Sequence, residues 1–188
     1  MSEAVIGFNL VLVWEEFSAG VAHPLAEPGI LLTLCALACL VGQSWPASSR
    51  AAISFFAVST LAGVAAARFG FPSEAQDAGP LLIALVAALS AAVAPAAWPA
   101  ATAALAVAGG FLTGAASTPV LLPLRVSLPA VAGALAGAIL ALALLIYTAG
   151  RFRQRFGGER GWIGLRIAAA WVAAIAMMML ALLSASAR

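Results

Sequence analysis

Residues 126–184 read VSLPAVAGALAGAILALALLIYTAGRFRQRFGGERGWIGLRIAAAWVAAIAMMMLALLS. Two continuous apolar runs, 126–149 and 161–184, flank a short stretch in which arginine is the main residue. Each run exceeds the roughly 20 residues that an α-helix needs to cross the hydrocarbon core of a bilayer. This stretch therefore predicts a pair of membrane-spanning helices joined by a basic connection.

The rest of the chain has the same character. It contains 188 residues, of which 64% are hydrophobic and 9% are charged, whereas soluble domains carry roughly 25% charged residues. The apolar runs are rich in Ala and Leu and do not alternate as the strands of a membrane barrel do. We therefore expect an all-α integral membrane protein, a compact bundle of about six transmembrane helices within residues 29–188. The expected spans are 29–45, 51–67, 79–98, 99–118, 126–149 and 161–184, with a helix break between Pro95 and Pro99.

The first 28 residues form a separate N-terminal segment. Their apolar run, 6–14, has nine residues and is too short to cross a bilayer as a helix. We interpret residues 1–22 as an interfacial or amphipathic element, or as an early extension of the first span. Within the span 126–149, Gly133 and Gly137 form a small-xxx-small pair that favours close helix packing.

The distribution of arginine predicts the orientation. Clusters of basic residues in short loops are retained on the cytoplasmic side of a membrane, so we expect residues 151–160 to be cytoplasmic. With six spans, both termini then lie outside. Six of the nine arginines lie inside and six of the seven acidic residues lie outside. The expected cytoplasmic anchor consists of Arg151, Arg153, Arg155 and Arg160.

The chain contains few residues that are suited to catalysis. The single histidine, His23, has no nucleophile at a suggestive spacing, and there is no CxxC motif or glycine-rich phosphate loop. We expect neither an enzyme nor a bound cofactor, and the formal charge of +2 does not indicate a nucleic-acid partner. No Asp, Glu, Lys or His lies deep within an expected span, which disfavours a proton relay. The residues that remain for a polar path are Gln43, Thr113, Ser117 and Tyr147.

One group of residues at the start of the first span has metal-binding chemistry. Glu15, Glu16, His23 and Glu27 lie within thirteen residues at the expected outer interface. An imidazole with carboxylates can collect a borderline divalent cation such as nickel. The alternative is a solvated acidic mouth in which His23 and Pro24 shape the start of the helix. Cys35 and Cys39 share a helix face and are expected to pack as small apolar residues.

The stretch FSAGVAHPLAEPGILLTLCALACLVGQ, residues 17–43, resembles the first span of the HupE/UreJ family, F-x-x-G-x-x-H-P-L-x-G-x-D-H-L-L-A-M. The matching residues are Phe17, Gly20, His23, Pro24, Leu25, Leu31 and Leu32. Where the family has Gly, Asp and a second His, this chain has Glu27, Gly29 and Ile30.

Two further stretches extend the resemblance along the chain. GGFLTGAASTPV, residues 109–120, is similar to a histidine-rich H-G-x-A-H-G segment of the family, with Thr113 and Ser117 at the histidine positions. GLRIAAAWVAAIAMMMLALL, residues 164–183, is similar to the family's last helix. The metal ligands of the family are therefore mostly absent.

The family consists of small bacterial membrane proteins associated with nickel or cobalt uptake, so the resemblance implies the bacterial inner membrane. Two functions stay open. The first is a diverged accessory or structural subunit with a degenerate metal site, whose partners are membrane lipids and other membrane protein subunits or a second copy. The alternative is a permease for nickel, cobalt or a small solute, to which the metal binds transiently. A polar path that converges on one cavity would favour the permease.

Overall fold

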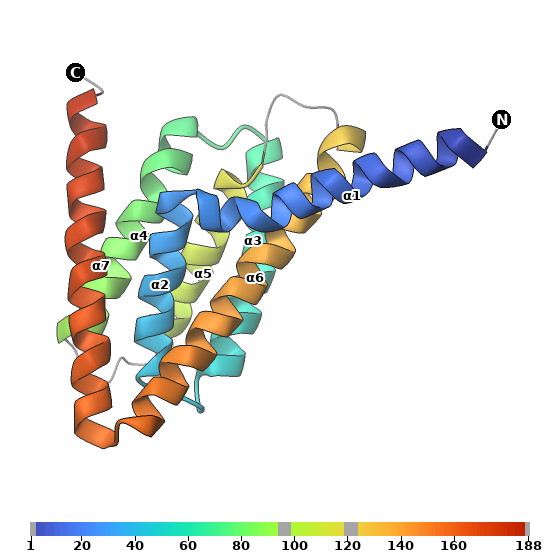
Figure 1. The fold of residues 1–188 in the computed structure, drawn as a ribbon. Helices are drawn as coiled ribbons and strands as arrows, with labels where there is room; N and C mark the ends of the chain where they lie inside the picture. The colour runs from blue at the N-terminus through green and yellow to red at the C-terminus, as the bar shows by residue number, and fades with distance from the viewer. Residues whose placement is uncertain (1–2, 94–98, 119–123, 187–188) are drawn as a thin grey trace.

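The computed structural model describes residues 3–93, 99–118 and 124–186, with side chains described at 11–72, 75–93, 99–118, 128–157 and 159–186. Within these ranges the chain forms α-helices and no strands (Figure 1). The helices are α1 (Glu3–Ala26), α2 (Pro28–Gly42), α3 (Ser49–Arg68), α4 (Ser73–Val93), α5 (Pro99–Ala116), α6 (Leu124–Arg155) and α7 (Gly158–Ser186). The all-α fold expected from the sequence is confirmed.

The helices α3 to α7 are each long and apolar enough to cross a membrane. The helix α2 has 15 residues, about 22 Å of helix, which is shorter than a hydrocarbon core of roughly 30 Å. It passes the same test together with the second half of α1, as a pair bent by 68°. The chain is thus a multi-pass membrane protein with five spans, or six when the bent pair counts as one, in agreement with the expected bundle.

The bend between α1 and α2 has a local cause at Glu27. The proline ring of Pro28 disfavours the helical conformation in the preceding residue and supplies no backbone N–H. Glu27 accordingly has an extended backbone with φ −91° and ψ 109°, and α2 begins at Pro28. Figure 1 shows the result, in which α2 runs along the bundle while α1 crosses one end of it and continues beyond α6.

Glycines let α1 lie directly on α6. A Cβ atom added at Gly133 or Gly137 of α6 would overlap the backbone carbonyl of Phe17 or Val21 in α1, respectively. Gly20 of α1 approaches the backbone of α6 in the same way. The small-xxx-small pair of α6 therefore faces α1, and backbone contact of this kind stabilises helix pairs through dispersion in the absence of a hydrophobic driving force.

The helix α2 is the centre of the bundle. It contacts α4, α5, α6 and α7 as well as its neighbours in the chain. Its side chains Ile30, Leu34 and Leu40 have no exposed surface. A helix that is apolar on every side is stable only when other helices surround it. The short α2 is therefore packed inside the protein, and the longer spans carry most of the surface that meets lipid.

One connection differs from the sequence expectation, and another lies outside the described residues. The expected break at Pro95 falls in residues 94–98, which lie outside the described residues, and α5 begins at Pro99. The basic stretch 151–155 was expected in a loop but continues α6 as helix. Arginine is a good helix former and a cation is favourable near a helix C-terminus, and the chain turns only at Gly157, with φ +68°.

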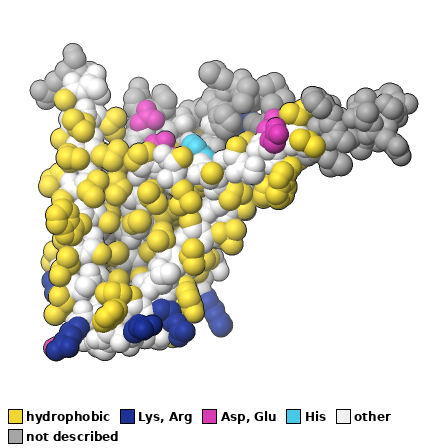
Figure 2. Space-filling model, in the orientation of Figure 1, with side chains coloured by type: hydrophobic (Ala, Val, Ile, Leu, Met, Phe, Trp, Pro, Cys, Tyr) yellow, Lys and Arg dark blue, Asp and Glu magenta, His cyan; other side chains and the backbone are white. Residues whose placement is uncertain are grey.

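Charge separates along the bundle axis. Figure 2 shows arginines along one end of the molecule, whereas the carboxylates and the single histidine gather mainly at the other. The start of α1 and the end of α7 both lie at the end opposite the arginines (Figure 1). The side chains of Glu3, Glu74, Arg125 and Arg188, which also entered the expected orientation, lie outside the described residues.

We predict that Gly133→Ile lowers the free energy of unfolding, because its side chain would force α1 away from α6. Overpacking of this kind costs about 1–3 kcal/mol. The matched control is Ala132→Ile, on the exposed side of the same helical turn. Unfolding in detergent, followed by circular dichroism, measures both variants, and equal stability of the two would contradict the described packing.

Candidate functional site

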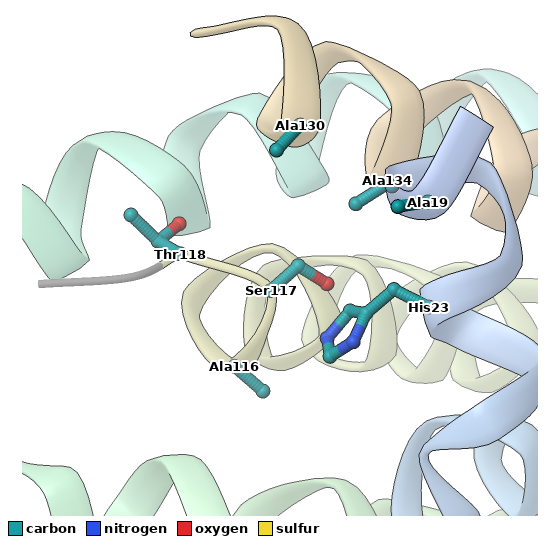
Figure 3. Close-up of a pocket in the computed structure, with 8 residues that line it drawn as sticks. Ala19, His23, Ala116, Ser117, Thr118, Ala130 and Ala134 are labelled. Atoms are coloured by element: carbon teal, nitrogen blue, oxygen red, sulfur yellow. The ribbon is translucent and has the colours of Figure 1, made fainter. Parts of the chain in front are cut away.

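A pocket of about 350 Å³ lies at the carboxylate end of the bundle, where α1, α5 and α6 meet. Figure 3 shows His23 of α1 and Ser117, just past the end of α5, on its wall. The remaining lining residues are small: Ala19, Gly20, Ala116, Thr118, Ala130 and Ala134. The pocket therefore brings together two residues that the sequence separates by more than ninety positions.

The ends of two helices build this pocket. His23 lies in the last turn of α1, just before the bend, and is half-buried. Ser117 and Thr118 follow α5, and their hydroxyls donate to the carbonyls of Thr113 (2.7 Å) and Gly114 (2.9 Å). The carbonyl of Thr113 also accepts the backbone N–H of Ser117 (3.0 Å), and the Thr118 hydroxyl bonds to a carbonyl close to the helix end, where intrahelical N–H partners run out. The two hydroxyl protons are thereby fixed, and the oxygen lone pairs remain available to accept hydrogen bonds.

Beneath the pocket, Thr113 is fully buried, and its Oγ1 atom has no hydrogen-bond partner. The described walls thus offer one imidazole and two accepting hydroxyls, on an otherwise apolar surface of small side chains. Such a lining can hold a small neutral or cationic molecule by one or two hydrogen bonds.

The carboxylates expected near His23 lie elsewhere on the surface. Glu15 and Glu16 precede His23 by about two helical turns, roughly 10–12 Å along the axis; Glu15 is exposed and Glu16 half-buried. Glu27 is exposed at the bend. None of the three lines the pocket. Across the part of the chain that the structure describes, no three His, Cys, Asp or Glu residues gather into a group that could hold a metal ion.

The candidate path residues divide between the two ends of the bundle. Thr113 and Ser117 lie one helical turn apart at the pocket. Gln43 lies buried just beyond the last residue of α2, and Tyr147 is exposed near the arginine end of α6. The other hydroxyls also fail to converge: Ser54 is exposed, and Ser59, Thr60 and Ser90 bond to carbonyls of their own helices.

Gln43 has a different role, which it shares with Arg166. The Nε2 atom of Gln43 donates to the carbonyl of Ala91 (2.6 Å), and Nε of Arg166 donates to that of Ala92 (2.5 Å). Both carbonyls belong to the last turn of α4, where no helical N–H is available. The guanidinium also stacks over the Trp162 ring at 4.6 Å. No motif in the sequence predicts this cap; only the general need of a helix end for hydrogen-bond donors points to it.

The arginine end carries a second polar surface. Arg151 lies over the Tyr147 ring at 5.6 Å, and Tyr147 meets Trp45 edge to face with a centroid separation of 6.0 Å. Arg155 and Arg160 are exposed, and Arg153 is half-buried. Three of the four predicted anchor residues thus lie in the last turns of α6 and the fourth in the first turn of α7.

Comparison with known proteins adds no relative: no protein-family model, curated protein or solved structure matches the chain. The fold and composition alone define its class, an α-helical multi-pass membrane protein. The resemblance to the HupE/UreJ family stays a hypothesis that rests on the sequence motifs quoted above.

We predict that Arg166→Leu lowers the free energy of unfolding by roughly 1.5 kcal/mol, the value of a hydrogen bond to a charged donor. The loss arises because the last carbonyls of α4 would keep only the Gln43 amide. Arg160→Leu, which removes an exposed arginine from the same helix, is the control. Chemical unfolding in detergent compares the two, and an equal effect would show that the cap does not contribute.

Proposed function

We propose that this protein is a non-enzymatic accessory or structural subunit of a larger membrane protein complex. The proposal rests on the observation that polar side chains in the interior form hydrogen bonds with the helix backbones. Thr33 donates to backbone carbonyls of α2 and α4, and Gln43 caps α4. Ser59 and Thr60 donate to a carbonyl within α3, and Ser117 and Thr118, which follow α5, donate to carbonyls of α5. These groups stabilise the bundle.

A transport path needs polar side chains that face a continuous cavity, because ionisable and polar groups are costly in lipid unless they line such a route. The cavity at His23 and the surface at Tyr147 share no lining residue. Between them the described core consists of side chains such as Leu34, Leu37 and Ala138, each at most 1% exposed. A close-packed apolar core of this kind supports a scaffold better than a conduit.

The outer surface of α7 is suited to docking. Of its apolar window, 17% is buried inside the bundle, against 33–39% for α3, α4, α5 and α6. Trp171 and Met178 expose 68% and 59% of their surface, and Ile167 exposes 56%. A helix so weakly covered, and carrying a large aromatic ring at its middle, offers a face on which a neighbouring membrane subunit can pack.

We also propose how the protein is oriented in the membrane and which membrane it occupies. By the positive-inside rule, the arginine end faces the cytoplasm and both termini lie outside, in the bacterial inner membrane that the HupE/UreJ resemblance implies. His23, with Glu15, Glu16 and Glu27 nearby on the outer side, is then what remains of a metal site. A single imidazole without grouped carboxylates retains little selectivity among divalent metals.

The pocket supports a second candidate function, a permease for nickel, cobalt or a small solute. The resemblance assigns Ser117 to a position that is histidine in the family, and the pocket holds Ser117 together with His23. The unpartnered Thr113 hydroxyl directly below gives a next polar position. In this reading the pocket is the outer binding site, and transport would require α1 or α5 to move.

One purification separates the two candidates. The native protein, extracted in a gentle detergent, is analysed for bound metal and for co-purifying chains by mass spectrometry. We predict other membrane subunits in a fixed ratio and no nickel or cobalt, in both the wild type and His23→Ala, because the described residues provide no ligand group. A protein without partners whose nickel or cobalt disappears in His23→Ala would overturn the proposal in favour of the permease.

A further inference from the structure

A groove of about 450 Å³ opens between α6 and α7, with α2 as its floor. Figure 1 shows α6 and α7 diverging from their connection at Gly157, with α2 between them. Cys35, Ala38 and Cys39 form the floor. The walls are Leu145, Thr148, Ala149 and Phe152 of α6 and Gly164, Leu165, Ala168 and Val172 of α7. The groove lies in the half of the bundle that ends at the arginines.

The lining of this groove is almost entirely apolar. The thiols of Cys35 and Cys39 are free and act as small apolar groups, and Thr148 donates its hydroxyl proton to Leu145 O at 2.9 Å. At the depth of the membrane-spanning part of α6 and α7, such a groove is in contact with hydrocarbon. A hydrocarbon chain can therefore enter it sideways without crossing a polar barrier.

The groove continues into a cationic crevice of about 600 Å³ on α6. Thr148 and Phe152 line both cavities. The crevice adds Tyr147, Arg151, Gln154, Arg155 and Phe156. Figure 2 shows the same arrangement on this face, with hydrophobic side chains above a row of arginines. An apolar slot that ends at two guanidinium groups is complementary to an amphiphile with an anionic head.

We propose that this combined cavity binds one anionic phospholipid, with an acyl chain in the groove and the phosphate headgroup at Arg151 and Arg155. Arginine binds phosphate oxygens through paired N–H donors, and basic sites between membrane helices recognise anionic headgroups. The bound lipid fills the space between α6, α7 and α2, and so fixes the angle of the α6–α7 hairpin. This inference is independent of the proposed function.

A lipid fits the dimensions of the groove better than a helix from another chain. An α-helix with its side chains is about 10 Å wide, so three turns occupy more than roughly 1,000 Å³. The groove provides about 450 Å³, with Phe152 of α6 and Leu165 of α7 on opposite walls. A slender acyl chain can enter such a space, whereas a packed helix would have to displace α6 or α7.

The proposal is tested by native mass spectrometry of the purified protein, titrated with phosphatidylglycerol or with phosphatidylcholine of identical acyl chains. We expect one molecule of phosphatidylglycerol to be retained in preference to phosphatidylcholine. Arg155→Gln or Arg151→Gln should reduce that preference about fivefold, the effect of one basic residue near a membrane surface. Arg50→Gln, an exposed arginine at the same end on α3, is the matched control and should leave the preference unchanged.

A second variant tests the groove itself. Ala168→Phe places a ring in the slot and should reduce retention of both lipids, whereas Ala170→Phe, on an exposed position of α7 outside the groove, should not. Equal retention of the two lipids by the wild type, or equal loss in the Arg50 and Arg155 variants, would overturn the headgroup assignment. A protein adduct on a photoreactive side chain placed at Ala168, in the groove wall, would show that another chain occupies the groove instead.

Discussion

The bilayer requires every backbone polar group within it to find a partner in the protein, because hydrocarbon offers none. Continuous helices meet most of this requirement. The remaining carbonyls, at helix ends and beside prolines, receive the few polar side chains that the chain contains: Gln43 and Arg166 cap α4, and Ser117 and Thr118 cap α5. Most of these polar groups bond to the helices themselves, whereas Oγ1 of Thr113 and Oε1 of Gln43 have no partner among the described residues.

The hydrocarbon of the bilayer also constrains how the helices pack. Without a hydrophobic force between helices, close backbone contact stabilises the bundle, and glycine permits it where α1 crosses α6 and where α3 meets α5 at Gly63, Gly110 and Gly114. The bend at Glu27 then places α1 across the end of the bundle. The pocket at His23 is a consequence of this crossing, and the lipid groove is a consequence of the divergence of α6 from α7 at the opposite end.

The sequence predicted the class of fold, because hydropathy acts locally along the chain. It did not predict that Arg151, Arg153 and Arg155 continue a helix, since their charge was interpreted as a loop signal. The sequence placed His23 in a metal-entry group and Ser117 in a separate polar path, and the structure brings both to one pocket. The sequence analysis grouped Glu15, Glu16 and Glu27 with His23 because they are close along the chain. In the structure, the rise of α1 separates Glu15 and Glu16 from His23, and the bend after α1 separates Glu27 from it. The groove at Cys35 exists because α6 and α7 diverge, and the hydropathy of the sequence does not predict the angle between two helices.

The proposed accessory role requires a partner contact on the lipid-facing surface of α7 and no internal site. The most direct measurement is site-specific photo-cross-linking in native membranes, with the reactive side chain at Trp171 of α7 or at Val58 of α3, which are 68% and 69% exposed. We expect one defined membrane protein attached at position 171 and only lipid at position 58. Lipid adducts alone at both positions would contradict it.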